Sequence, residues 1–233
     1  MKCAIMQPTY FPWLGYFDLI RKVDRFVIYD HVKFEKQSWQ QRNRIRNKQG
    51  EIMLILAVCH DNGLNRCIKD VRIDFSRNII ARHLKSIKHS YSHSMNFDII
   101  YPDIENVLLK KWDLLIDLNI ELIKLGMKHL SIKKEILFSS ELNITGHKVE
   151  ALVDVCGRIG ADEYLSPAGS KTYIEENNIF GDNKIKLFYQ HFDHPIYKQM
   201  NYKNFISHLS FIDYLFNVEK AEIEKFGSLD IFI

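Results

Sequence analysis

Short apolar runs alternate along this chain with segments in which apolar residues recur at helical spacing. The runs at residues 3–6 and 25–29 are bounded by polar or loop-forming residues, which is typical of buried strands. Between them, apolar residues at 14, 17, 20 and 23 predict a short helix over residues 14–23. Strand, helix and strand in this order predict a βαβ unit with parallel strands and a right-handed crossover.

The same alternation continues over the rest of the chain. Further strands are predicted at residues 42–46, 51–58, 71–75, 135–138, 163–165 and 186–189. Further helices are predicted at residues 76–91, 105–125, 145–159, 205–217 and 220–226, the first capped by Ser76 and the second preceded by Pro102 and ended by Gly126. This pattern predicts a three-layer α/β fold with a mostly parallel, Rossmann-like sheet and a helical C-terminal part. We expect a single domain over residues 1–233, with a helical lobe formed by parts of 76–130 and 200–233.

Composition narrows the class of protein. The 233 residues are 46% hydrophobic and 26% charged, which is ordinary for a globular chain. No run approaches the length of a membrane span, and the N-terminal apolar run is too short for a secretory signal. The four cysteines form no C-x-x-C pair and lie scattered among apolar residues, which favours reduced thiols. We therefore expect a cytoplasmic protein.

The net charge of +3 conceals a basic N-terminal segment. Residues 1–50 carry ten Lys or Arg and four Asp or Glu, and many of the aromatic residues lie in the same segment. Basic and aromatic side chains together favour a small anionic, partly planar ligand rather than a nucleic acid. A solvated charged face above the core is an equally good interpretation of composition alone.

The loop that follows the first strand is the most unusual segment. It contains two prolines and three aromatic residues where a polar connection is expected, and α/β proteins bind ligands beyond the carboxyl ends of their strands. A glycine near the start of the next helix would let an anion approach the backbone. The candidate substrate contacts here are Gln7, Tyr10, Trp13, Gly15 and Tyr16. The alternative is an aromatic plug in the core.

A second candidate segment begins where the second strand ends. Asp30 lies at that end, where it is either a catalytic carboxylate or a loop cap. The alternation of Arg42, Arg44 and Arg46 predicts a strand with three guanidinium groups on one face. Such groups can bind phosphate with two hydrogen bonds each, and a neighbouring indole can stack on a base or sugar. The candidate substrate contacts are Lys36, Trp39, Arg42, Asn43 and Arg44.

The C-terminal third holds the remaining candidates. His194 lacks the partner cluster that a metal site needs, so a general base is the better functional interpretation, although most histidines are structural. Asp213 lies at the edge of an apolar helical stripe and needs a partner, either His194, a basic ligand group or nearby backbone. The small-residue loop at 166–170 suits phosphate weakly. The candidate substrate contacts here are Ser166, Gly169, Tyr197 and Gln199.

Several enzyme classes lose support because their motifs are absent. The chain contains no G-x-S-x-G, G-x-G-x-x-G, G-x-x-x-x-G-K-[ST] or H-E-x-x-H motif. Gly15 is followed by Tyr16 rather than by the histidine of adenylyl-transferring αβα proteins. Nucleotidyl transfer on the first βαβ unit therefore counts only as an alternative.

Several of these segments together resemble the WbqC-like family, whose proteins are encoded among bacterial O-antigen and surface-polysaccharide biosynthesis genes. The matching segments are IMQPTYFPWLGYFDLI at 5–20, the strand that ends in Asp30, KQSWQQRNRIR at 36–46, YLSPAGSKTYI at 164–174, HPIYKQ at 194–199 and FISHLSFIDYLFN at 205–217. Residues 76–145 contribute little to this resemblance. The segment LAVCHDNG at 56–63 departs from the expected apolar-proline pattern, so no thiol role for Cys59 follows from the resemblance.

The resemblance implies a pathway, O-antigen or lipopolysaccharide biosynthesis, more firmly than a reaction. The implied task is transfer of an acyl or aminoacyl unit, glycine being one candidate, to the amino group of a nucleotide-linked amino-deoxy sugar. In this scheme His194, with Asp30 or Asp213, deprotonates the amine. We expect no tightly bound cofactor and no metal, and the donor would be an acyl carrier protein, a coenzyme A thioester or an aminoacyl-tRNA. The alternatives are a non-catalytic scaffold of glycan assembly and an adenylate-forming enzyme.

Overall fold

In the computed structural model the chain folds into two units that share helix α1 (Leu14–Arg21). The structure describes all residues except 60–65, 175–177, 201–203 and 229–233. Unit 1 comprises Met1–Gln7, Asp18–His31 and Lys134–Asp193, and unit 2 comprises Pro8–Phe17, Val32–Lys133 and His194–Ile233. The single domain expected over residues 1–233 stays a prediction.

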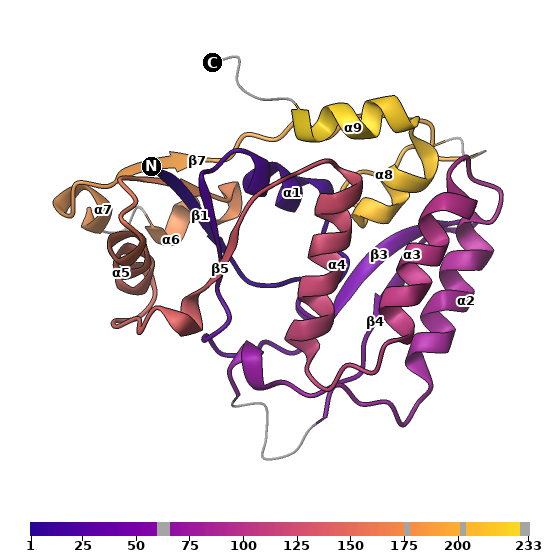
Figure 1. Cartoon of the computed structure of the whole chain (residues 1–233), viewed down its shortest axis with the longest axis horizontal. Coiled ribbons are helices and arrows are strands. Elements are labelled where there is room, and N and C mark those ends of the chain that lie inside the picture. Colours follow the sequence, from indigo (N-terminus) through magenta and orange to yellow (C-terminus); the bar gives the residue numbers. More distant parts are fainter. Residues whose placement is uncertain (60–65, 175–177, 201–203, 229–233) are drawn as a thin grey trace. The chain divides into compact units, whose positions relative to one another are not determined.

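A parallel sheet forms the centre of unit 1 (Figure 1). Its strand order is β5-β2-β1-β6-β7, and every neighbouring pair is parallel, which confirms the predicted α/β fold with a mostly parallel sheet. The strands are β1 (Lys2–Met6), β2 (Arg25–Ile28), β5 (Ile136–Phe138), β6 (Glu163–Ser166) and β7 (Lys186–Tyr189). The chain leaves β1 toward β2 on one side and returns later to β6 on the other, so ligand-binding polar groups are expected between the carboxyl ends of β1 and β6.

Helix α5 (Val149–Ile159) supplies much of the core of unit 1. Its buried residues Val149, Leu152, Val155 and Cys156 pack with apolar side chains of the sheet strands. The helix ends at Gly160, whose φ of 72° is the left-handed conformation that favours glycine at this position. Two short helices complete the helical part of this unit, α6 (Lys171–Ile174) and α7 (Ile179–Asp182).

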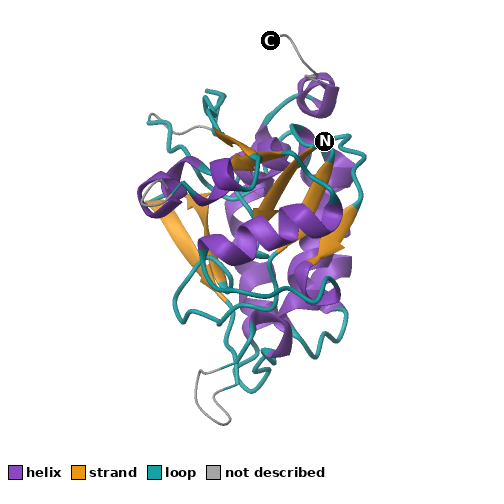
Figure 2. Ribbon diagram, turned by 90° about the vertical axis from the view of Figure 1, so that its left-hand side faces the viewer, coloured by secondary structure: helices purple, strands orange, loops and turns teal. Residues whose placement is uncertain are grey.

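Unit 2 combines an antiparallel strand pair with helices, which Figure 2 distinguishes by colour. Strands β3 (Arg42–Asn47) and β4 (Gly50–Ile55) form the pair, with Arg44 opposite Met53. The helices are α2 (Ile79–Tyr91), α3 (Phe97–Leu109), α4 (Leu115–His129), α8 (Phe211–Asn217) and α9 (Lys220–Ser228). Helices α2 and α8 both contact β3, so the strand that carries the three arginines is held between elements far apart in sequence.

The single helix predicted over residues 105–125 is wrong, because the structure has α3 and α4 there with a break at 110–114. The indole Nε1 of Trp112 donates to the carbonyl of Val107 at 2.8 Å and so satisfies an acceptor in the last turn of α3. Gly126 does not end the second helix. It lies inside α4, where a Cβ atom would come within 2.2 Å of the Phe17 ring, so this glycine permits close packing.

The observed ends of other helices and strands also differ from the predicted ones. Helix α8 begins at Phe211 rather than at 205, and the Ser210 hydroxyl accepts a hydrogen bond from the Ile212 amide as its N-cap. The expected strand at 71–75 has only isolated bridges, Val58 with Ile73 and Arg72 with Leu114. Strand β4 ends at Ile55, α2 starts at Ile79, and α5 starts at Val149.

Within the described part of the chain, no helix has the length and apolar character needed to cross a membrane. Cys3, Cys59, Cys67 and Cys156 carry reduced thiols, and none of these four is in a disulfide bond.

Candidate functional site

A cluster of aromatic and imidazole rings gathers chain segments of unit 2 that are almost two hundred residues apart. The His208 ring stacks on the Trp13 indole, with 4.8 Å between the ring centroids and 28° between their planes. The His194 ring lies 5.2 Å from His208, 5.7 Å from Phe205 and 6.2 Å from Tyr197. We call these five residues the imidazole cluster.

His194 is oriented by a hydrogen bond to the backbone. Its Nδ1 lies 2.9 Å from the carbonyl oxygen of Pro195. A carbonyl oxygen only accepts hydrogen bonds, so Nδ1 carries the proton and Nε2 is the basic nitrogen of the neutral ring. Burial lowers the pKa of His194, the Pro195 hydrogen bond opposes that shift, and the charge of His208 lowers the pKa further. This environment favours a neutral imidazole that can accept a proton at Nε2.

Asp213 is fully buried, and its carboxylate accepts three hydrogen bonds. Tyr91 donates to Oδ1 at 2.7 Å, while Tyr197 and Gln199 donate to Oδ2, each at 2.8 Å. Burial raises the pKa of Asp213, and these three hydrogen bonds together with the charge of Arg46 oppose the shift. The partners that Asp213 was predicted to need are therefore two phenol hydroxyls and one side-chain amide. Tyr197, which donates to the Asp213 carboxylate, also packs beside the His194 ring and so links the two residues.

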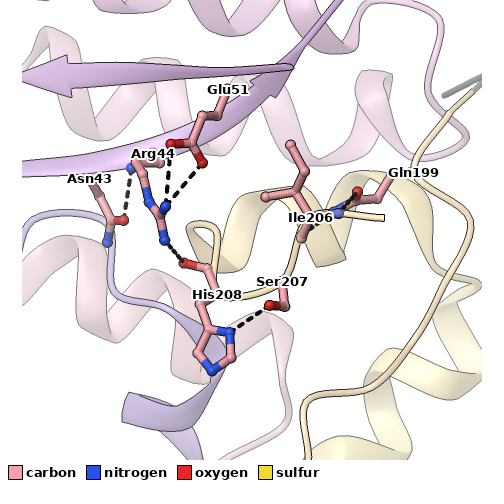
Figure 3. A network of polar contacts seen from close by, with 7 residues as sticks. All are labelled: Asn43, Arg44, Glu51, Gln199, Ile206, Ser207 and His208. Carbon is pink, nitrogen blue, oxygen red and sulfur yellow. Dashed lines mark hydrogen bonds and ion pairs between the residues drawn. The ribbon is translucent and has the colours of Figure 1, made fainter. Parts of the chain in front are cut away.

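Gln199 holds the segment before α8 in place rather than facing solvent. Its amide Nε2 donates to the Ile206 carbonyl at 2.8 Å, and its Oε1 accepts from the Ile206 amide at 2.9 Å (Figure 3). The side chain is 3% exposed, so its contacts are internal. This clamp fixes the backbone two residues before His208.

The three arginines of β3 have three different surroundings. Arg44 pairs with Glu51 at 3.0 Å and donates to the His208 carbonyl at 3.4 Å (Figure 3). Arg46 is buried, and its backbone amide donates to the Tyr91 hydroxyl at 2.9 Å. The guanidinium of Arg42 makes no hydrogen bond or ion pair with the described residues and lies 5.8 Å from the Trp39 ring. The three arginines predicted on one face of this strand therefore differ in their contacts.

Trp39 and Arg42 form the part of this strand best suited to an anionic ligand. The Trp39 side chain is 47% exposed, and both Arg42 and Arg44 lie within 6 Å of its ring. Arg42 and Trp39 thus combine a charge without a protein counter-ion and an exposed indole. Lys36 is exposed nearby in sequence. Asn43, by contrast, is buried and bonds to the Phe11 carbonyl at 2.7 Å and to the Arg44 amide at 2.8 Å.

The loop after β1 is mostly an aromatic plug, as the alternative interpretation proposed. Tyr10 is buried and shares a hydrogen bond of 2.9 Å with Nδ1 of His83, and Tyr16 is buried in α1. A Cβ atom on Gly15 would come within 2.1 Å of the Trp13 indole, so the group that approaches this glycine is Trp13 itself. Of the aromatic candidates in this loop, only Trp13 joins the imidazole cluster.

The remaining candidates belong to unit 1. Asp30 is buried and accepts hydrogen bonds from Ser139 Oγ at 2.9 Å and from the backbone and hydroxyl of Ser140 at 2.9 and 2.6 Å. These contacts make Asp30 a cap of the 3₁₀ turn Ser139–Glu141, which was the structural alternative for this residue. Ser139 also bonds to Nδ1 of His31 at 2.7 Å. Cooperation of Asp30, which lies in unit 1, with His194, which lies in unit 2, stays a prediction.

Three other candidates follow the strands of the parallel sheet. Gln7 is half-buried directly after β1. Ser166 is buried at the end of β6, with its Oγ 2.5 Å from that of Ser170. Gly169 is exposed in the short turn that follows. The positions of Gln7 and Ser166 agree with the ligand-binding edge of such sheets, and their contact with substrate stays a prediction.

Sequence reasoning missed His208. The residue lies in the segment FISHLSFIDYLFN, for which a helix over 205–217 was predicted and in which only Asp213 was singled out. In the structure it adopts a φ of 59° outside any helix. Glu51 was missed as well, because its role depends on the pairing of β3 with β4. Among the described residues, no group of three or more His, Cys, Asp or Glu side chains could hold a metal ion.

The chain is similar to known proteins over nearly its whole length. Residues 7–225 match the model of the WbqC-like protein family. A protein of Mycobacterium tuberculosis (strain ATCC 25618 / H37Rv) named "Uncharacterized protein Rv1507c" is 30% identical to this chain over 219 residues, which cover 93% of this chain and 94% of that protein. No solved structure matches the chain.

Proposed function

The chain belongs to the WbqC-like protein family, and from this premise we propose that it is an N-acyl or aminoacyl transferase of polysaccharide biosynthesis. Its acceptor is the amino group of a nucleotide-linked amino-deoxy sugar, and glycine is a candidate for the transferred unit. The donor enters as an activated co-substrate. The observation that carries this proposal is the orientation and environment of His194.

Acyl transfer to an amine needs a base close to the attacking nitrogen. The Pro195 carbonyl fixes the His194 tautomer, and burial lowers its pKa and so favours the neutral imidazole, whose Nε2 is the nitrogen that can accept a proton. Tyr197 packs beside the ring and is itself fixed by Asp213. The base is thus held on one side by backbone and on the other by a buried hydrogen-bond network.

The bonds and protons of the proposed step can be followed from acceptor and donor to the products. The sugar nitrogen attacks the carbonyl carbon of the donor, a C–N bond forms, and His194 Nε2 takes the proton that the nitrogen loses. The bond between the carbonyl carbon and the leaving oxygen or sulfur then breaks, and the leaving group takes up a proton. Base assistance of this kind contributes about 10²- to 10⁴-fold to the rate, and holding both reactants in place contributes further.

The same unit offers a place for the nucleotide part of the acceptor. Arg42 supplies a positive charge without a counter-ion among the described residues, and Trp39 supplies an exposed ring for stacking. A diphosphate beside a planar base matches that combination. This match supports a nucleotide sugar over an uncharged acceptor.

Binding and turnover test the proposal separately. Calorimetry with UDP-, dTDP- and GDP-linked amino sugars is expected to show binding of at least one of them. With that sugar, transfer from acyl carrier protein, coenzyme A and aminoacyl-tRNA donors is followed by mass spectrometry. His194→Gln is expected to lower turnover by about 10²- to 10⁴-fold and to leave sugar binding intact. His89→Gln, at an exposed position on α2, is the matched control and should change neither.

Other results would favour the alternatives. If none of the sugars binds, the transferase is excluded. Capture of other glycan-assembly enzymes that does not depend on His194 or Arg42 would then favour a scaffold. ATP–pyrophosphate exchange by the purified protein would favour adenylate-forming chemistry.

A further inference from the structure

His208 has an unusual backbone conformation at an exposed position. Its φ of 59° lies in the left-handed region, which residues other than glycine adopt uncommonly, although asparagine, aspartate and histidine do so more often than the rest. Its ring is not buried, so packing in the core does not explain why a histidine occupies this position. Strained conformations of this kind persist only where the surrounding structure holds them, and they concentrate at functional sites.

Contacts from several directions hold His208 in this conformation. Arg44 donates to its carbonyl oxygen at 3.4 Å, and Gln199 clamps the backbone at Ile206 (Figure 3). The Ser207 hydroxyl lies 2.7 Å from Nδ1, and the Trp13 indole stacks on the ring. The main chain and the ring are therefore fixed independently.

The side chain is presented toward the same region as the proposed base. The centroids of the His208 and His194 rings are 5.2 Å apart. Nδ1 of His208 is engaged by Ser207, and Nε2 makes no hydrogen bond with the described residues. Nε2 is therefore the nitrogen of His208 that can meet a ligand.

We propose that His208 is the general acid of the transfer, which donates a proton from Nε2 to the leaving group, and that the donor is consequently an aminoacyl oxygen ester. This inference rests on the proposed transferase function and assigns the class of its donor. Such an ester occurs at the ribose hydroxyl of a charged tRNA, and the shared chemistry is an alcohol as leaving group.

The protons balance between the two imidazoles. His194 Nε2 takes a proton from the attacking amine as the C–N bond forms. His208, which starts as the imidazolium, gives its Nε2 proton to the ester oxygen as the C–O bond breaks, so the alcohol leaves in neutral form and a neutral imidazole remains. At the end His194 carries one proton more and His208 one fewer than at the start, and exchange with water restores both.

Oxygen esters and thioesters differ in whether their leaving group needs a proton from an acid. An alkoxide is strongly basic and leaves slowly without a proton, whereas a thiolate is stable near neutral pH because thiol pKa values lie near about 8.5. A second imidazole beside the base is useful only for the more basic leaving group. The presence of His208 therefore favours an ester donor over a coenzyme A or carrier-protein thioester.

The test uses two glycyl donors that differ in their leaving group. One is 2′(3′)-O-glycyladenosine, whose alcohol needs a proton to leave, and the other is glycine p-nitrophenyl ester, whose phenolate leaves without one. His208→Asn keeps a residue that tolerates a positive φ and removes the acid. We expect it to lower turnover with glycyladenosine about 100-fold or more, and turnover with the p-nitrophenyl ester by less than about threefold. His194→Gln should lower both rates.

Each outcome bears on the proposal. Equal losses with both donors in His208→Asn, or no loss with either, would overturn the role of His208 while leaving the transferase intact. If the wild-type protein transfers glycine from neither ester, the ester donor and the role of His208 are excluded, whereas absence of transfer from the thioester donors as well removes the transferase. His89→Asn is the control for an exposed histidine, and thermal unfolding of His208→Asn distinguishes misfolding from loss of the acid. If that variant is unfolded, His208→Gly, which accepts the same φ, replaces it in the same two-donor comparison.

Discussion

At the scale of single residues, chemically identical side chains serve different purposes because their neighbours differ. Arg44 supports the His208 backbone, Arg46 lies in the core near Asp213, and Arg42 lies beside Trp39 without a counter-ion among the described residues. Their alternation in sequence places them on one strand but says nothing about which of them is neutralised. That information comes from Glu51 and Asp213, which the fold brings from elsewhere in the chain.

Removal of the Asp213 carboxylate is expected to destabilise the protein strongly. In Asp213→Ala, the hydroxyls of Tyr91 and Tyr197 and the amide of Gln199 lose their acceptor in the core. Each unsatisfied buried donor costs about 1–3 kcal/mol, so we expect the free energy of unfolding to fall by at least about 3 kcal/mol in urea denaturation. Asp193→Ala, at an exposed position, is the control and should change little. A loss as small as that of the control would show that the network adds no stability.

The pH dependence of turnover should report the environment of His194. Its neutral form is the base, and burial lowers its pKa, so activity should persist as the pH falls below the usual histidine pKa of 6.5 and decline only at lower pH. In Phe205→Ala the His194 ring is less buried. This raises the pKa of His194 and moves the acidic limb of the activity profile to higher pH. The pH profile of kcat/KM measures this shift. An unmoved limb in Phe205→Ala would exclude His194 as the titrating base.

At the scale of elements, the start of α1 is shaped by the fit between Gly15 and Trp13. A side chain on Gly15 would overlap the indole at 2.1 Å and force it away from His208. We therefore expect Gly15→Ala to cost about 1–3 kcal/mol of stability, to alter tryptophan fluorescence and to lower turnover. Gly157→Ala is the control, because a Cβ atom at this helical position of α5 meets nothing within 4 Å, and it should stabilise by up to about 1 kcal/mol. An unchanged Gly15→Ala variant would contradict this packing.

Local sequence signals predicted the strands better than the helix ends. The apolar runs of β1, β2 and β7 are buried segments bounded by loop residues, and their strands lie where the pattern indicates. The break between α3 and α4 was not predictable in the same way, because Trp112 closes α3 through a contact with Val107 that no spacing rule expresses. Gly126 was misjudged for a similar reason, since its purpose is to make room for Phe17.

The candidate site was predictable only in part. His194 and Trp13 were singled out from residue type and position, and the structure places both in the imidazole cluster. Tyr10 and Tyr16 look like ligand-binding aromatics in a loop, yet both are buried. His208 escaped notice because its left-handed backbone depends on Arg44 and Gln199, which are distant in sequence or act across a turn.

At the scale of the whole molecule, charge is distributed unevenly along a chain whose net charge is only +3. The excess of basic over acidic residues within the first fifty is six, so the remaining residues carry a net negative charge. Within unit 2 the fold neutralises Arg44 through Glu51 and leaves Arg42 without such a partner among the described residues. Arg42 beside the exposed Trp39 ring is therefore the part of the basic segment that best suits a small anion.

Arg42 should therefore dominate the salt dependence of ligand binding. We expect Arg42→Ala to weaken binding of the nucleotide sugar identified by calorimetry about 10- to 100-fold, as loss of a hydrogen bond between charged groups does. The dependence of its dissociation constant on salt should become shallower, because one charge no longer attracts the diphosphate. Lys48→Ala, at an exposed position in the same basic segment, removes an equal charge outside the site and should leave both quantities nearly unchanged. Equal losses in the two variants would mean that the basic segment attracts anions only through its total charge, and the assignment of Arg42 to the diphosphate would then be wrong.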